Sequence, residues 1–272
     1  MSYNKYRSAR GWERRCVDFD KIHGDSSEAF QSLISSLGLE SGMVIGDLMC
    51  GYGEVSRKIL EYCLMNRLSV KCFLLEKYHV QMQRTHKYLA PYEKRFSVER
   101  KIQDIHDLSM KSTLDRAVIK MGLHELPKVK QEKAIRDIYL ALKPRGAIYV
   151  WECMGQSLPI TAAFREVVRK KDELAGLTSL VRERYFAHED EIHESLEKAG
   201  FLNIKTMYQG EFKYVTKVIA QADLNDDDGK LSYWNCWLRE NLSSDVKQTI
   251  RFNDAGDSIS MSFVKKIISA NK

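Results

Sequence analysis

The 272-residue sequence has no long apolar run, no paired cysteines and no secretory signal. No stretch approaches the ~18 consecutive apolar residues of a membrane-spanning helix. The first residues, MSYNKYRSARGWERR, are too polar for a signal peptide. The six cysteines are scattered, without a C-x-x-C pair or metal-ligand spacing. These absences exclude membrane-spanning and disulfide-rich classes, and they predict a cytoplasmic protein with reduced thiols and no metal site.

A calcium loop is also missing, although the segment DLNDDD (223–228) is strongly acidic. If Asp223 is placed at the first position of an EF-hand loop, Gly229 falls one residue late. Trp234 then stands where the closing glutamate belongs. We therefore expect no calcium site in this segment.

What the sequence does contain is a regular alternation of short apolar runs and helical patterns. Runs rich in apolar residues predict strands, and apolar residues spaced by three or four predict helices. Five alternations of strand and helix predict a parallel α/β sheet with helices on both faces. The expected strands are residues 43–49, 70–76, 96–102, 115–121 and 146–152, and the expected helices are residues 27–37, 54–66, 78–90 and 128–142.

The alternation loosens after residue 156. Two amphipathic helices and two strands follow, at residues 162–177, 189–201, 202–210 and 258–270. Residues 211–256 are too long for a simple hairpin connection and predict an insertion that serves as a substrate lid. The expected organisation is an N-terminal arm (1–26), a core (27–210 and 257–272) and the insertion (211–256).

The N-terminal arm carries much of the excess positive charge. The whole chain has a formal net charge of +6, and residues 1–15 contain five Lys or Arg side chains against Glu13. Tyr3, Tyr6 and Trp12 accompany these charges. Such an arm either covers an anionic ligand or forms a solvated amphipathic helix.

A glycine turn follows the first expected strand, in MVIGDLMCGYGEVSRKIL (43–60). Gly51 and Gly53 allow close approach of a ligand, and the start of the following helix favours an anion. Glu76 ends the second strand, where a carboxylate can accept both hydroxyls of a ribose, and Asp104 follows the third. Because open parallel sheets bind ligands at the carboxyl ends of their strands, the three features together predict a nucleotide-type site.

Five segments, in this order, resemble the class I S-adenosylmethionine-dependent methyltransferases. They are VIGDLMCGYGEV, FLLEKYHVQM, QDIHDL, LDRAVIKMGLHELP and ALKPRGAIYVWE, and LEKAGFLNIKT adds a C-terminal match. The spacing is most similar to the ubiquinone/menaquinone-type (methyltransferase type 11-like) branch, which mostly methylates small molecules and some peptides. The resemblance implies a three-layer, doubly wound, mostly parallel sheet of seven strands, with the last strand antiparallel, in a Rossmann-like methyltransferase fold. It also implies S-adenosylmethionine as the cofactor.

The resemblance assigns site residues by position. Asp47 would orient the amino-acid part of the cofactor, Glu76 would hold the ribose, and Asp104 with Ile105 would flank the adenine. Met49 stands where the family has its first glycine. The full set of implied cofactor-binding residues is Asp47, Met49, Gly51, Gly53, Glu76, Lys77, Asp104, Ile105, Lys120 and Met121.

Two other classes of protein stay open. A nicotinamide-binding oxidoreductase needs G-x-G-x-x-G, and here Ser56 occupies the third glycine position. A methyltransferase fold with a purely binding role is the other alternative. The LKPRG turn and the long last strand after an insertion favour methyl transfer.

His124, just past the fourth strand, is the expected catalytic base, with Tyr3 as a second catalytic candidate and His23, Glu152 and Tyr6 as alternates. The segment MGLHELP (121–127) lacks the N-P-P-Y type of motif, and the chain has no Pro-Cys dipeptide, so nucleic acid is disfavoured as a substrate. Arginine can grip a carboxylate, which favours O-methylation of a carboxylate or hydroxyl on a small molecule or peptide that is anionic. The expected substrate-binding residues are Tyr6, Arg7, Arg14, Trp234 and Trp237.

Overall fold

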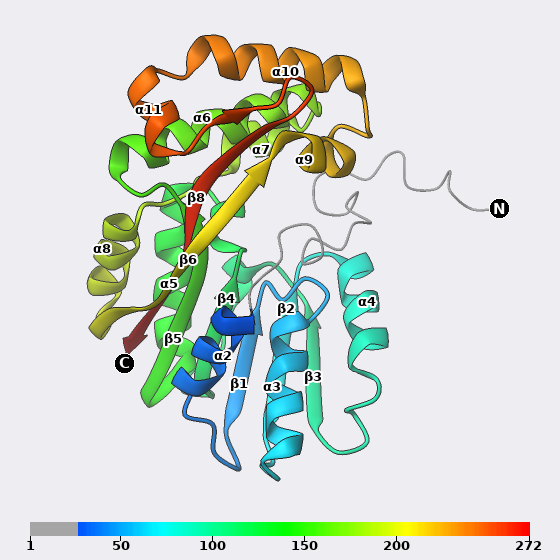
Figure 1. Ribbon diagram of the computed structural model, residues 1–272. Coiled ribbons are helices and arrows are strands. Elements are labelled where there is room, and N and C mark those ends of the chain that lie inside the picture. The colour runs from blue at the N-terminus through cyan, green and yellow to red at the C-terminus, as the bar shows by residue number, and fades with distance from the viewer. Residues whose placement is uncertain (1–26) are drawn as a thin grey trace, which may run out of the picture. The chain divides into compact units, whose positions relative to one another are not determined.

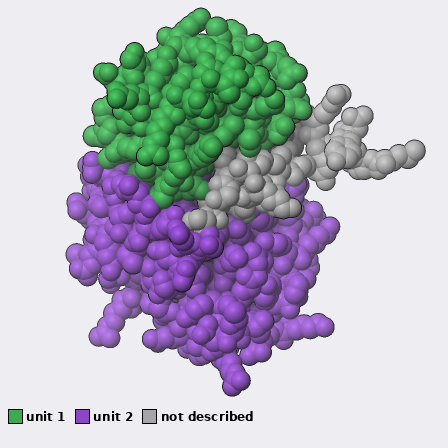
Figure 2. Space-filling model, in the orientation of Figure 1, with its two compact units in different colours: residues 1–25, 153–188, 210–265 green, residues 26–152, 189–209, 266–272 purple. Residues whose placement is uncertain are grey.

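The computed structural model describes residues 27–272 and divides the chain into two compact units (Figure 2). The described part of unit 2 comprises residues 27–152, 189–209 and 266–272. The described part of unit 1 comprises residues 153–188 and 210–265. Within residues 27–272, no helix combines the length and apolar character needed to cross a membrane.

A single mostly parallel sheet organises the fold (Figure 1). The strand order is β3-β2-β1-β4-β5-β8-β6, and β1, β2, β3, β4 and β5 pair in parallel. The long last strand, β8, runs opposite to β6 (Figure 1). The two-residue β7 pairs antiparallel with β8, which brings the sheet to eight strands. The strands are β1 (Val44–Leu48), β2 (Lys71–Glu76), β3 (Ser97–Ile102), β4 (Leu114–Lys120), β5 (Leu142–Met154), β6 (Leu202–Val215), β7 (Asn253–Asp254) and β8 (Ile259–Asn271).

Helices cover both faces of the part of the sheet that belongs to unit 2. Helices α2 (Ser27–Ser36), α3 (Glu54–Met65) and α4 (His79–Leu89) contact one another in sequence, and their apolar side chains share one core cluster with β1 and β2. Helices α5 (Lys128–Ala141) and α8 (Glu189–Ala199) contact each other. This is the parallel sheet with helices on both faces that the alternation of strands and helices predicted, and the three-layer, doubly wound arrangement that the resemblance implied.

The apolar runs become strands because the sheet buries them. Five of the six residues of β2 are buried, as a central parallel strand with both faces covered requires. β3 contains no buried residue, because it lies at the end of the strand order. β5 begins at Leu142 rather than at Gly146, so the LKPRG segment is part of the strand.

Unit 1 is mainly helical and has an aromatic core of its own. Phe164 on α6 lies 4.3 Å, ring to ring, from Phe263, and 4.7 Å from Phe186. A buried ionic cluster also ties its helices together, since Lys171 contacts the carboxylates of Asp172 and Asp223. Its helices are α6 (Leu158–Leu174), α7 (Thr178–Glu183), α9 (Thr216–Asp223), α10 (Asp228–Asn241) and α11 (Ser244–Thr249).

Candidate functional site

The glycine turn between β1 and α3 has an unusual backbone at three positions. Met49, Gly51 and Gly53 all have positive φ angles, of 60°, 55° and 86°. For a residue with a side chain, a positive φ costs roughly 1–2 kcal/mol. A glycine at position 49 would avoid this cost, which Met49 does not. A Cβ atom on Gly53 would lie 2.7 Å from the Thr85 methyl carbon of α4, so glycine is required there on two grounds.

Asp47, near the end of β1, fixes the turn to the following helix. Its Oδ2 accepts hydrogen bonds from the backbone N–H of Ser56 at 3.0 Å and from the Ser56 hydroxyl at 2.7 Å. Burial raises the pKa of Asp47 to about 6, although both bonds from Ser56 and the charge of Lys120 oppose this shift. Ser56 therefore has a structural role as the donor to this carboxylate.

Glu76, the last residue of β2, lies directly against the turn. Its Oε2 accepts the backbone N–H of Gly51 at 2.9 Å, and its Oε1 accepts that of Tyr78 at 2.9 Å. The hydroxyl of Thr85 donates to the carbonyl of Gly51 at 2.8 Å, so the glycine is held on both sides. Burial is the main cause that raises the pKa of Glu76 to about 7.

These raised pKa values make the stability of the protein depend on pH. Asp47 and Glu76 bind protons more tightly in the folded state, with pKa values of about 6 and about 7, than in the unfolded chain, with 3.8 and 4.5. Proton binding by these two groups stabilises the folded state. This stabilisation is complete below the pKa values of the unfolded chain, and it is lost as pH rises through the pKa values of the folded state. We therefore expect these two groups to lower the free energy of unfolding between about pH 4 and pH 8, by roughly 1–3 kcal/mol each. Urea unfolding measured across this pH range should show that the free energy of unfolding falls less steeply with pH in Glu76→Gln than in the unchanged protein. An equally steep fall in both proteins would contradict the raised pKa of Glu76.

Asp104 follows β3 and pairs with a lysine that follows β2. Its Oδ2 lies 3.0 Å from Nζ of Lys77, and its Oδ1 accepts the backbone N–H of His106 at 3.1 Å. Burial alone would raise the pKa of Asp104, but the His106 N–H and Lys77 outweigh it, so the pKa lies below its usual value. Asp104 is thus an anion at neutral pH. The buried Ile105 opens the short helix η2 (Ile105–Asp107) beside it.

The end of β4 contacts the glycine turn. A Cβ atom on Gly122 would lie 2.9 Å from the Cβ of Met49, so the segment after β4 runs directly against the turn after β1. Met121 has a φ of 52° and donates its N–H to the carbonyl of Trp151 at 2.7 Å. Lys120 forms an ion pair with Glu54 of α3, with Nζ to Oε2 at 3.0 Å.

His124 lies two residues beyond Gly122, in the short helix η3 (Leu123–Glu125), and is buried. Its Nδ1 is 2.6 Å from Oε2 of Glu152 on β5, and its Nε2 is 3.4 Å from Oε1 of Glu125. The other oxygen of Glu152 accepts the backbone N–H of Leu123 at 2.7 Å and that of His124 at 3.3 Å. Glu152 thereby fixes both the imidazole ring and the backbone that carries it.

The electrostatics of this pair favour the protonated ring. Burial by itself lowers the pKa of His124, but the charge of Glu152 and the hydrogen bonds with Glu125 and Glu152 outweigh it and raise the pKa to about 9. The imidazole is therefore an acid at neutral pH and becomes a base at higher pH. Nε2 lies 3.4 Å from Glu125 and is held less closely than Nδ1, which lies 2.6 Å from Glu152, so we expect Nε2 to be the ring atom that exchanges a proton.

The structure brings the expected cofactor residues and His124 together at the carboxyl ends of β1 to β4. Sequence patterns missed four residues at the same place. Thr85 and Ser56 support the turn, and Glu54 and Glu125 pair with Lys120 and His124. Thr85 is 34 positions from its partner, and no local pattern signals such a contact. Tyr3, Tyr6, Arg7, Arg14 and His23 lie outside the described residues.

The two tryptophans expected in a substrate wall belong to unit 1. Trp234 is fully buried in its core, with its ring 6.0 Å from that of Tyr214. Trp237 is half-buried, 6.0 Å from Nζ of Lys170, and Tyr233 lies beside the same lysine at 5.2 Å. The surroundings of Trp234 indicate packing, and a role of either residue in substrate binding stays a prediction.

Comparisons with known proteins identify the fold. No family model matches the chain, and no curated protein matches its sequence. The YcgJ protein of Bacillus subtilis is similar in structure at a TM-score of 0.74 and 13% identity, over 91% of this chain and 99% of that one. A candidate methyltransferase of Bacillus halodurans is similar in structure at a TM-score of 0.73 and 13% identity, over 90% of this chain and 99% of that one.

A third similar structure contains a ligand. Phosphoethanolamine N-methyltransferase 2 of Haemonchus contortus, in complex with phosphomonomethylethanolamine and S-adenosylhomocysteine, gives a TM-score of 0.56 and 14% identity, over 93% of this chain and 56% of that one. At these identities the likeness concerns the fold alone. The chain therefore has the Rossmann-like methyltransferase fold of the Bacillus halodurans structure, as its sequence predicted.

Proposed function

We propose that the protein binds S-adenosylmethionine at the turn between β1 and α3. The observation that supports this is the chemistry of the donor set: a close-packed glycine turn flanked by the carboxylates of Glu76 and Asp104 at neighbouring strand ends. Carboxylates at these places suit ribose hydroxyls and the adenine amine, and Gly51 and Gly53 leave room at the backbone. The residues therefore fit the cofactor.

S-adenosylmethionine, when bound, supplies a methyl group activated by a sulfonium. The chain's part is to hold an acceptor in line with that group and to exclude water, because positioning accounts for much of the acceleration in such displacements. His124 contributes a proton acceptor at Nε2, oriented by Glu152. This dyad, beside the turn, is the single observation that carries the proposal of a catalytic role rather than a binding role alone.

The acceptor we favour is a hydroxyl or carboxylate oxygen of a small molecule or peptide. A base with a pKa of about 9 suits a hydroxyl whose own proton leaves at mildly alkaline pH, because proton transfer is efficient between groups of similar pKa. A carboxylate acceptor would need no base, and the protonated His124 would then stabilise its charge. The pH dependence of the rate separates these two acceptors.

Glu76 provides the test of the cofactor. In Glu76→Ala, calorimetry should show the affinity for S-adenosylmethionine or S-adenosylhomocysteine falling by roughly 1–3 kcal/mol, because charge-assisted hydrogen bonds are lost. Glu99→Ala is the matched control, since Glu99 is a carboxylate in the neighbouring strand β3 that pairs with Lys71. Binding of NAD or NADP by the unchanged protein at comparable affinity would contradict the proposal and favour an oxidoreductase.

A further inference from the structure

The segment from the end of β2 to the end of β3 concentrates positive charge. Residues 77–102 contain seven Lys and Arg residues and two Glu residues, a formal charge of +5, while the whole chain carries +6. This segment forms α4, the turn after it and the edge strand β3. A basic surface of this density attracts an anionic partner.

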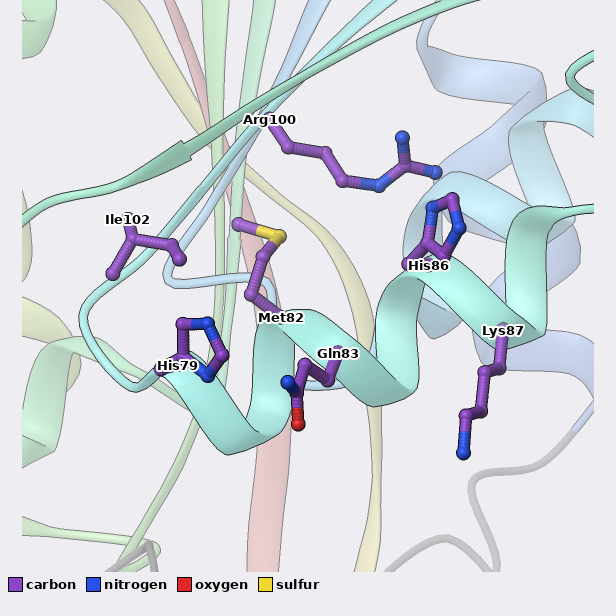
Figure 3. Close-up of a pocket in the computed structure, with 7 residues that line it drawn as sticks. All are labelled: His79, Met82, Gln83, His86, Lys87, Arg100 and Ile102. Atoms are coloured by element: carbon purple, nitrogen blue, oxygen red, sulfur yellow. The ribbon is translucent and has the colours of Figure 1, made fainter.

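A groove runs between α4 and β3 within this segment (Figure 3). It has a volume of about 430 Å³. Met82 reaches from α4 toward β3, and Ile102, which is 52% exposed, forms an apolar patch with it (Figure 3). Polar and basic side chains line the rest of the groove: His79, Gln83, His86, Lys87 and Arg100. The groove thus combines an apolar floor with a basic rim.

β3 offers backbone hydrogen-bonding groups at the same place. It is the last strand in the sheet order, and among residues 27–272 only β2 pairs with it. Gln103 donates its N–H to the carbonyl of Glu76 on β2 at 3.0 Å. Since backbone groups alternate in direction along a strand, Arg100 and Ile102 direct their N–H and C=O groups away from β2. The residues that line the groove are therefore those whose backbone faces the open edge.

We propose that this groove binds an acidic, extended peptide segment of a partner protein, which adds a strand to the edge of β3. Strand addition uses the open backbone groups for affinity and the alternate side chains for specificity. In the added strand, apolar side chains contact Ile102 above the buried Met82, and carboxylates face Lys87. Arg100 is already paired with Glu93 and contributes its open backbone groups instead. This proposal does not depend on the proposed methyl transfer, because the groove contains none of the residues assigned to the cofactor or to catalysis.

Charge argues against the other occupants. A second copy of the chain would place the same basic residues against each other, and like charges across an interface disfavour association. The arm at residues 1–15 carries a formal charge of +4 and would be repelled for the same reason. Nucleic acid matches the charge, but it does not use the open strand edge or the apolar floor.

The test is a binding titration of the full chain with a fluorescent octapeptide of alternating glutamate and valine. We expect saturable binding that is lost when alternate amides of the peptide are N-methylated, because the charge is kept and the strand hydrogen bonds are removed. Lys87→Glu should weaken binding about tenfold. Lys94→Glu, the same charge change at an exposed residue outside the groove, should leave it within about twofold.

Three results would overturn the proposal. The first is equal binding of the N-methylated peptide, which excludes strand addition. The second is tighter binding of an oligothymidylate of equal charge, or of a synthetic peptide of residues 1–15, than of the acidic peptide. The third is an equal loss of affinity for the acidic peptide in Lys94→Glu and Lys87→Glu, with both variants shown by thermal unfolding to be folded. Calorimetry with S-adenosylmethionine on the same samples tests the proposed cofactor site separately, because none of these three results depends on cofactor binding.

Discussion

Replacing His124 with alanine should lower kcat by about two to four orders of magnitude, while the affinity for S-adenosylmethionine stays within about twofold. The imidazole is the only ring among residues 27–272 that lies buried between two carboxylates at the end of β4. Removing it deletes the proton acceptor at Nε2 and leaves the contacts of the glycine turn in place. Steady-state kinetics and cofactor calorimetry on the same preparation measure both effects.

The pH profile shows whether His124 acts as a base. Because its folded pKa is about 9, kcat/KM for a hydroxyl acceptor should rise with pH and level off near 9. In Glu152→Gln the rise of kcat/KM with pH, the alkaline limb of the profile, should move to lower pH. The reason is that the charge of Glu152 is the largest cause that raises the pKa of His124. A residue with a purely structural role would not move the limb. His86→Ala is the control, since His86 is exposed on α4, and it should leave the profile unchanged.

A flat profile with normal turnover in His124→Ala would show that the ring is not needed as a base. In that case a carboxylate acceptor, already ionised at neutral pH, would account for the reaction by positioning alone.

Replacing Trp234 with alanine should lower the free energy of unfolding by about 3–5 kcal/mol. Its side chain is fully buried and packs edge-on against Tyr214 in the core of unit 1. Truncation leaves a large cavity among side chains that are already closely packed. Urea unfolding monitored by circular dichroism measures the loss.

Trp237→Ala is the matched control, three positions further along α10. Trp237 is half-buried, so its loss should cost under about 1 kcal/mol. Trp234→Phe should cost less than Trp234→Ala, because it keeps an aromatic ring, leaves a smaller cavity and removes an indole N–H that has no hydrogen-bond partner among the described residues. If Trp234→Ala were as stable as the unchanged protein and only KM rose, the residue would belong to a substrate wall after all.

The elements of the core could be predicted from the sequence because each is specified by local pattern. The run KCFLLE forms a strand because both faces of a central parallel strand are buried, and Gly51 and Gly53 mark a turn because their φ angles are positive. Glu76 and Asp104 were predictable as neighbours because the carboxyl ends of parallel strands lie along one edge of the sheet. These features depend on spacing along the chain alone.

The tertiary structure decided the contacts that give these residues their chemistry. Glu152 is 28 positions from His124, yet it holds the ring and raises its pKa, because β4 and β5 are adjacent in the sheet. Thr85 reaches Gly51 because α4 packs beside the turn, and Trp234 enters an aromatic core formed by segments far apart in the chain. The sequence by itself determined the order of strands and helices, the glycine turn and the place of the acidic residues, because these follow from short-range periodicity and backbone sterics. Only the folded sheet decided which charges meet and which side chains lose water, because both depend on neighbours that the local sequence does not specify.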